Sequence, residues 1–136
     1  MTDPAVTGEA TERITLTVPG ERRYIGIVRL FVGGLAARLG LGYETMDNLQ
    51  LALESVLRKA TPGGQITLEA CIDHDALSIL VGPLDRDLLR ADESRPESLE
   101  LERLLSALVT GAESISRDGS GWLRLDVRIP AGSGSA

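Results

Sequence analysis

The feature that most restricts the fold of this chain is a pair of amphipathic helical segments that follow each other directly. From Arg22 to Leu39, apolar residues recur every three or four positions, which places on one helical face Tyr24, Ile27, Val28, Phe31, Leu35 and Leu39. The sequence GLGYE at 40–44 breaks this pattern. A second helix then has on its buried side Met46, Leu49, Leu53, Val56, Leu57 and Ala60, and TPGG at 61–64 ends it.

Three glycines interrupt the first of these helices: Gly26, Gly33 and Gly34. Each costs about 1 kcal/mol relative to alanine in a helix interior. We therefore expect them to allow a close backbone approach or a bend.

Segments with the two-residue period of a strand flank the helices. The sequence RITLTVP at 13–19 alternates apolar residues with threonines, and QITLEACI at 65–72 and ALSILV at 76–81 are joined by the turn DHD. A last hairpin turns at DGSG, residues 118–121. Its return strand carries on one face Leu123, Leu125, Val127 and Ile129.

A third helix is expected between the two hairpins. Residues 82–96, with two prolines and seven charges, predict a connector, and Pro96 is well placed to open a helix that buries Leu101, Leu104, Leu105 and Leu108. The order β-α-α-β-β-α-β-β predicts an α+β two-layer sandwich, with a mostly antiparallel mixed sheet and three helices on one face. At 136 residues we expect one domain, over 12–130, with flexible tails at 1–11 and 131–136.

Composition excludes several functional classes. A formal net charge of −6 argues against direct binding to nucleic acid and favours a partner with a basic surface. The longest uncharged apolar stretch is far shorter than the roughly 20 residues that span a bilayer, and no leader pattern opens the chain. The single cysteine, Cys71, excludes an intramolecular disulfide. We expect a cytoplasmic protein without membrane contact.

The sequence RYIGIVRLFVGGLAARLGLGYETMDNLQLALES at 23–55 resembles the anti-sigma factor serine kinases of the histidine-kinase-like ATPase superfamily. In that family the two helices read like EYVGVIRL and D.EDLKIAVSEA.TNA. The resemblance runs without a gap from about Arg23 to Ala60, and the rest of the chain to about residue 130 fits the same fold less specifically. It implies a Bergerat-type ATPase fold.

The family holds ATP and Mg²⁺ through a helical E-x-x-x-N motif, whose two side chains lie one turn apart on one face. Laying the family form LALEEALTNA on LALESVLRKA at 51–60 puts Ser55 at the glutamate position and Lys59 at the asparagine position. A lone serine is no base near neutral pH, and lysine offers only donors and a positive charge where the metal would bind. Glu54 is one residue away, which is about 100° around the helix. We interpret Glu54 as a solvated helix carboxylate and not as a replacement.

Two further ATP motifs are also missing. The adenine-binding D-x-G-x-G corresponds to VGPLDRD at 81–87, with Pro83 or a neighbour at the aspartate position and Asp85 two residues away. The glycine-containing lid corresponds to DESRPESLELERL at 92–104, which has no glycine and five acidic residues. Such a segment would repel a triphosphate.

The resemblance also implies a protein-binding surface. In the family, the first helix and its flanks form a homodimer face and a docking site for a sigma factor or an STAS-type antagonist. The residues that would present this surface here are Arg22, Arg23, Tyr24 and Arg29. Arginine and tyrosine are frequent interface anchors. Singly, each arginine is equally well explained as a solvated helix residue.

Other candidate chemistry is weak. Cys71, Asp73, His74 and Asp75 are close in sequence, but they alternate faces of a strand and turn and have no second ligand cluster, so we expect no metal site. A Ser-His-Asp set built on His74 lacks the strand-turn-helix elbow. Trp122 is on the polar-facing register of the last strand, either as core cover or as a partner contact.

These observations predict a non-catalytic regulatory protein that resembles an anti-sigma factor, acts by partner switching as a homodimer and needs no cofactor. The alternative is an active ATP- and Mg²⁺-dependent serine kinase in which Glu54 and Asp85 replace the missing groups. A third reading is a homodimeric scaffold with an unrelated partner, or with a different small ligand in the vestigial pocket.

Overall fold

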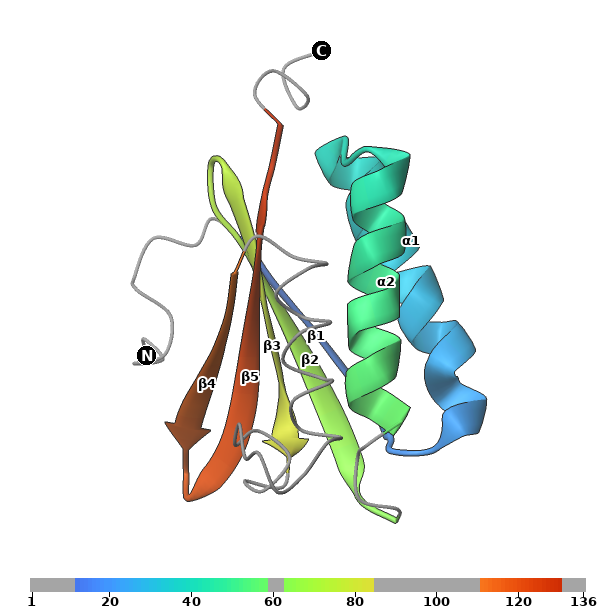
Figure 1. Cartoon of the computed structure of the whole chain (residues 1–136), viewed down its shortest axis with the longest axis vertical. Coiled ribbons are helices and arrows are strands. Elements are labelled where there is room, and N and C mark those ends of the chain that lie inside the picture. The colour runs from blue at the N-terminus through green and yellow to red at the C-terminus, as the bar shows by residue number, and fades with distance from the viewer. Residues whose placement is uncertain (1–11, 59–62, 85–110, 131–136) are drawn as a thin grey trace, which may run out of the picture.

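The computed structural model describes residues 12–58, 63–84 and 111–130, which form a two-layer α+β sandwich (Figure 1). In chain order the elements are β1 (Glu12–Pro19), a 3-10 turn (Arg22–Tyr24), α1 (Ile25–Leu39), α2 (Tyr43–Arg58), β2 (Gln65–Ile72), β3 (Ala76–Leu84), β4 (Gly111–Arg117) and β5 (Ser120–Arg128). This confirms the α+β class, with two helices and five strands near their predicted places, but the predicted order with a third helix is not matched by the described elements. The expected third helix and the acidic lid segment lie outside the described residues, as do both tails.

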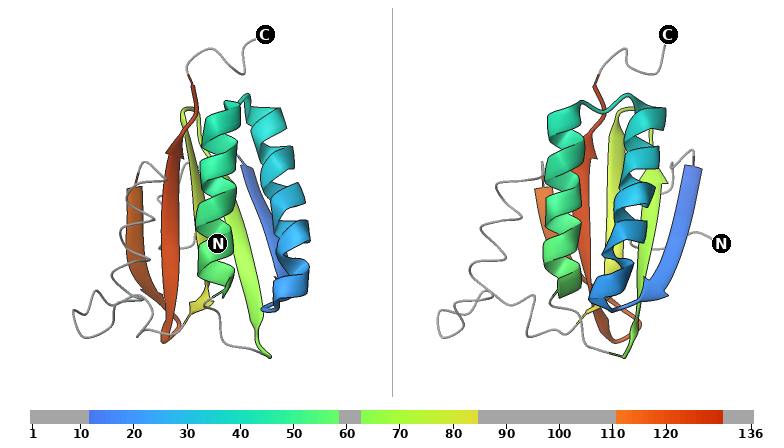
Figure 2. Two further views of the ribbon diagram at one scale, coloured as in Figure 1. Left: turned by 45° about the vertical axis from the view of Figure 1, so that its right-hand side comes forward. Right: turned by 90° about the vertical axis from the view of Figure 1, so that its right-hand side faces the viewer.

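The sheet has five strands in the order β1-β2-β3-β5-β4, and each of its four pairings is antiparallel. The expected mixture of parallel and antiparallel pairs is therefore not found among the described strands. Both α1 and α2 cover the same face of the sheet, with α1 nearer the β1 edge (Figure 2). The opposite face of the sheet carries neither of these helices.

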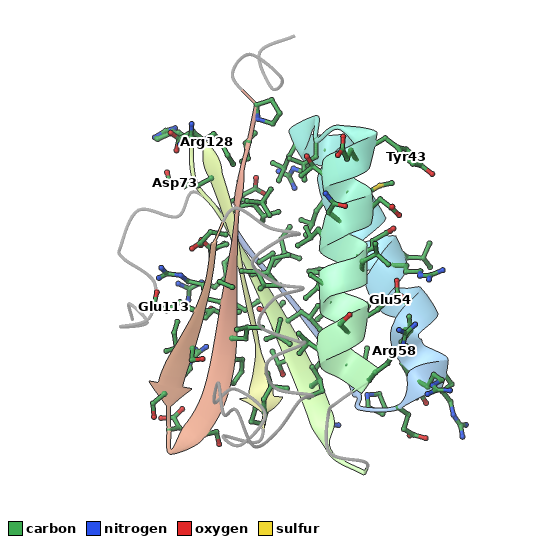
Figure 3. All side chains as sticks on the ribbon, in the orientation of Figure 1. Tyr43, Glu54, Arg58, Asp73, Glu113 and Arg128 are labelled. Atoms are coloured by element: carbon green, nitrogen blue, oxygen red, sulfur yellow. The ribbon has the colours of Figure 1, made fainter. Side chains whose placement is uncertain are left out.

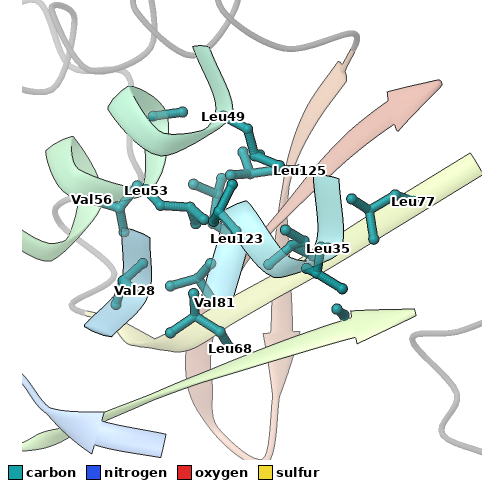
Figure 4. Close-up of a cluster of buried hydrophobic side chains, with 14 of the residues drawn as sticks. Val28, Leu35, Leu49, Leu53, Val56, Leu68, Leu77, Val81, Leu123 and Leu125 are labelled. Atoms are coloured by element: carbon teal, nitrogen blue, oxygen red, sulfur yellow. The ribbon is translucent and has the colours of Figure 1, made fainter. Parts of the chain in front are cut away.

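The core lies between the helices and the sheet, because alternate residues of β1, β2, β3 and β5 point at the helical layer (Figure 4). Leu68, Leu77 and Leu125 come from the strands and are fully buried in one cluster with Leu49 and Leu53 of α2. Burial of a leucine contributes roughly 1.5–3 kcal/mol, so this cluster supplies the main stabilisation of the sandwich.

Helix α1 differs from its sequence-based prediction in start and in face. Its first turn, at Arg22–Tyr24, is a 3-10 turn, and the α-helix begins at Ile25. The side chains that it buries most deeply are Val28, Val32, Leu35 and Ala36. Ile27, predicted to be buried, is exposed instead. The helix ends at Leu39 and is capped by Gly40, whose φ of 69° is the left-handed conformation that glycine adopts without strain.

Strand β3 continues past the end predicted for it. It includes the cis peptide bond between Gly82 and Pro83, where its pairing with β5 shifts in register, and it ends at Leu84. A Cβ atom added at Gly82 would lie 2.4 Å from Cδ2 of Trp122. The indole of Trp122 thus lies directly on the Gly82 backbone, and this contact requires glycine.

Candidate functional site

The junction between α1 and α2 is organised around one buried carboxylate. Glu54 of α2 is only 3% exposed, and its two oxygens accept hydrogen bonds from Nε and Nη2 of Arg29 on α1, each at 2.8 Å. This side-on bidentate geometry is the strongest arrangement between arginine and a carboxylate. The environment predicted for Glu54, a solvated helix carboxylate, is therefore wrong.

Further contacts fix the same junction. Nη2 of Arg58, one turn after Glu54, lies 3.7 Å from Oε1 of Glu54 (Figure 3). The side-chain amide of Gln50 donates a hydrogen bond to the backbone oxygen of Arg29 at 3.0 Å. Hydrogen bonds and charge from Glu54, with a further contribution from the charge of Asp47, raise the pKa of Arg29 above its usual value. Arg29 therefore stays charged at any accessible pH.

Of the residues assigned to the vestigial nucleotide site, the structure describes Ser55 on α2 and Pro83 in β3. Ser55 is half-buried, and its hydroxyl donates to the backbone oxygen of Leu51 at 3.0 Å, within its own helix. Because one residue turns a helix by about 100°, Ser55 lies on a different side of α2 from Glu54, which contacts α1. Pro83 is exposed in β3. Lys59 and Asp85 lie outside the described residues, so their contacts remain predictions.

Of the four residues predicted to bind a partner, three are arginines with exposed side chains. Arg22 and Arg23 are exposed, and Nε of Arg23 lies 3.5 Å from Oε1 of Glu21. Tyr24 is half-buried and packs against the hydrophobic core. Arg29 is 57% exposed but committed on one side to Glu54. The basic groups at this end come from the 3-10 turn and α1, with Arg58 added from α2.

The outward side of α1 is apolar although nothing in the described chain covers it. Leu30 is 77% exposed, and Ile27 is also exposed. Apart from adjoining residues and the backbone of α1 itself, no described atom lies within 4 Å of a Cβ atom built at Gly26, Gly33 or Gly34. The close backbone approach expected at these glycines is therefore not made by the described residues of this chain.

The helix-free face of the sheet holds a second polar network that the sequence reasoning missed. Glu69 of β2 is buried there between Arg13, whose Nε lies 3.4 Å away, and Arg117, whose Nη1 donates to it at 3.3 Å. Arg117 lies 4.9 Å above the ring of Trp122, within cation–π range. Trp122 is half-buried and lies on the polar-facing side of β5, as predicted. The alternation Thr67, Glu69, Cys71 on β2 was the available signal, because it places Glu69 opposite the helices.

The residues near the β2–β3 turn that were considered as a metal site, Cys71 and Asp73 to Asp75, include one hydrogen bond within the turn itself. Cys71 is buried within β2, and Oδ1 of Asp73 accepts a hydrogen bond from the backbone N–H of His74 at 2.6 Å. Among the described residues, no three His, Cys, Asp or Glu side chains gather so that they could hold a metal ion. In the same part of the chain, neither helix is long and apolar enough to cross a membrane.

The chain is similar to bacterial serine-protein kinases. It is 31% identical over 77 residues to the serine-protein kinase RsbW of Listeria monocytogenes, a match that covers 52% of this chain and 49% of the relative. The RsbW of Listeria innocua matches to the same extent. The RsbW of Oceanobacillus iheyensis is 26% identical over 98 residues, 67% of this chain and 55% of the relative.

These matches support the family resemblance drawn from residues 23–60. No family model matches the chain. The chain spans about half the length of the curated relatives it matches. Roles that belong to whole RsbW proteins are therefore proposals for this chain.

Proposed function

We propose that this protein is a non-catalytic regulator of the anti-sigma type, which binds a sigma factor or an STAS-type antagonist and has lost ATP binding. The similarity to RsbW kinases supports the regulatory class. The observation that carries the loss of catalysis is the position of Glu54. Ser55 and Lys59 stand where the family motif has its glutamate and asparagine, and Glu54 is the carboxylate closest in sequence to the missing base.

Glu54 is a poor substitute for that base because it is already used. Both of its oxygens accept hydrogen bonds from Arg29 on the α1 side of α2. To act on a nucleotide on the Ser55 side, Glu54 would have to leave this pair and turn around the helix. Leaving it would cost Glu54 two charge-assisted hydrogen bonds, which are about twice as strong as neutral ones.

The partner-binding part of the proposal rests on the helical layer. Arg22, Arg23 and Arg29 supply exposed positive charge, and the exposed Leu30 and uncovered glycines of α1 supply an apolar strip. Glycines in a helix allow another helix to approach closely, so the same strip supports a homodimer through α1. We further propose that the protein acts in the cytoplasm.

The test of the catalytic proposal is a calorimetric titration of the purified full chain with ATP in the presence of Mg²⁺. We expect no saturable binding at micromolar to low millimolar nucleotide. A micromolar dissociation constant would contradict the proposal. Titration without Mg²⁺ serves as the control, because a working site of this family uses the metal to hold the phosphates.

The second candidate is an active serine-protein kinase, which is favoured by the similarity to the serine-protein kinases RsbW. It would require Asp85 and Glu54 to take the roles of the missing groups. Incubation with γ-labelled ATP and purified STAS-domain proteins distinguishes the candidates, because transfer of label to a serine supports the kinase. If a pull-down with this chain recovers only unrelated proteins, with no sigma factor and no STAS-domain protein among them, the result would favour a homodimeric scaffold with an unrelated partner.

A further inference from the structure

Strand β4 is the edge of the sheet opposite β1 (Figure 1). Among the described strands it pairs only with β5, and its residues are mostly exposed. An edge strand presents unpaired N–H and C=O groups, and proteins usually protect it with lysine, proline or a bulge. The sequence of β4, GAESISR, has no lysine or proline, and its register with β5 runs from Gly111 to Arg117 without a shift.

The turn after β4 determines which backbone groups point to the outer edge, the side of β4 away from β5. Asp118 and Gly119, with φ values of 52° and 78°, form a two-residue turn. Positive φ at both positions is typical of the type I′ turn of hairpins, in which the carbonyl before the turn accepts a hydrogen bond from the N–H after it. The backbone carbonyl of Arg117 therefore points at Ser120 of β5.

The backbone groups at the outer edge belong to small residues. Because the N–H and C=O groups of successive residues point to alternate sides of an antiparallel strand, those of Ala112, Ser114 and Ser116 point away from β5. These three residues are exposed in the described structure, and none has a side chain larger than that of serine. A second strand can therefore approach the outer edge without displacing a large side chain.

The side chains on the other residues of β4 are self-complementary. Glu113, Ile115 and Arg117 lie on the helix-free face of the sheet, where Ile115 is opposite Trp122. If a second copy of β4 lies antiparallel to the first, with Ile115 at the two-fold axis, each Glu113 faces Arg117 of the other copy. Opposite charges on facing strands are stabilising, and the symmetry makes this pair twice. The two Ile115 side chains meet between them.

The same register also pairs the backbone groups. Ser114 of one copy faces Ser116 of the other, and both direct their N–H and C=O groups to the outer edge, so each such pair can exchange two hydrogen bonds. Moving the axis to Ser114 or to Glu113 would place Glu113 against Ile115 or against a second Glu113. Of these three registers, the one centred on Ile115 pairs the charges.

We propose that β4 pairs with β4 of a second copy of this chain, antiparallel and centred on Ile115, so that two five-stranded sheets become one continuous sheet. Glu113 can contribute because its ion pair with Arg124 uses Oε2, and its side chain is 60% exposed. The interface is small, so we expect association at hundreds of micromolar. It needs neither a regulatory partner nor the dimer through α1, and since α1 is nearer the β1 edge, it would link such dimers.

The pairing is isolated in the full-length variant Leu30→Glu, which is designed to remove association through α1. In sedimentation equilibrium we expect its mass to rise from that of a monomer at tens of micromolar towards that of a dimer at hundreds of micromolar. Adding Ser114→Pro should abolish this rise, because proline removes an N–H that points to the outer edge and leaves the hydrogen bonds to β5 in place. Trp122 fluorescence checks that β4 still packs on β5, since Trp122 is opposite Ile115.

The matched control is Ala112→Pro in the same Leu30→Glu chain. The N–H of Ala112 also points to the outer edge, but in the proposed register Ala112 would face the turn residue Asp118 and lies outside the paired part. This variant should therefore associate as before. A monomer at every concentration without either proline, or equal loss with both prolines, would overturn the proposal. A wild-type chain that is monomeric at tens of micromolar would contradict the α1 homodimer and leave this test intact.

Amide hydrogen exchange of the wild-type chain gives a second readout. Between tens and hundreds of micromolar, the N–H groups of Ser114 and Ser116 should exchange about two- to five-fold more slowly, while that of Ala112 should not change. Added salt should weaken the association, because the two ion pairs are exposed. Unchanged exchange at both serines while the mass rises would place the contact on another surface, and association that does not depend on salt would contradict the charge pairing.

Discussion

At the scale of single residues, Glu54 is the most informative. Its direction on α2 was predicted correctly, but its environment was predicted wrongly. Periodicity predicted that Glu54 does not share a face with Ser55, but it could not predict that Arg29 would be opposite, since residues 25 positions apart meet only through packing of α1 on α2. A helical wheel shows on which side of its helix a residue lies, but not which residue of another element it contacts. The same reasoning explains why the Glu69–Arg117 contact between β2 and β4 was missed.

Restoring the two family residues of the first ATP motif should not restore nucleotide binding. We expect the double variant Ser55→Glu with Lys59→Asn to show no ATP-dependent heat in calorimetry with Mg²⁺, because the adenine-binding aspartate and the glycine-containing lid are also absent from the sequence. Circular dichroism checks that the variant is folded. Measurable ATP hydrolysis by this variant would mean that the other two motifs matter less than we propose.

At the scale of secondary structure, the strands were predicted better than the first helix. In a strand, strict alternation of apolar and polar residues identifies the face that is buried. In α1, by contrast, apolar residues occur nearly all around the helix, so the sequence does not single out one buried face. This is why Ile27 was placed in the core although Val32 lies there and Ile27 is exposed. The extension of β3 was missed because Gly82 and Pro83 normally signal the end of a strand.

Two glycine substitutions in these elements should have opposite effects on stability. Gly82→Ala places a Cβ atom 2.4 Å from the Trp122 ring, so we expect a loss of about 1–3 kcal/mol in the free energy of unfolding. Gly34→Ala meets no described atom within 4 Å in the interior of α1, and we expect a gain of up to about 1 kcal/mol. Urea unfolding followed by Trp122 fluorescence measures both, and an unchanged Gly82→Ala would contradict the packing described for Trp122.

At the scale of the whole molecule, the helical layer and the helix-free face of the sheet differ in the side chains that they expose. On the helix-free face of the sheet, Glu69 is buried between the long side chains of Arg13 and Arg117. The helical layer, by contrast, leaves Leu30 of α1 exposed to the rest of the described residues. An exposed apolar strip of this kind is suited to association with another protein surface.

Self-association through α1 is therefore expected to depend on Leu30. We predict that the wild-type chain sediments as a dimer at tens of micromolar and that Leu30→Glu sediments as a monomer, because two like charges would be brought together at a two-fold interface. Ser114→Glu, which adds the same charge at an exposed position of β4, should remain a dimer. The Leu30→Glu variant should keep its unfolding midpoint at low concentration, since Leu30 is 77% exposed in the folded chain. A monomeric wild type would contradict the homodimer, and a Leu30→Glu dimer would place the interface on another surface.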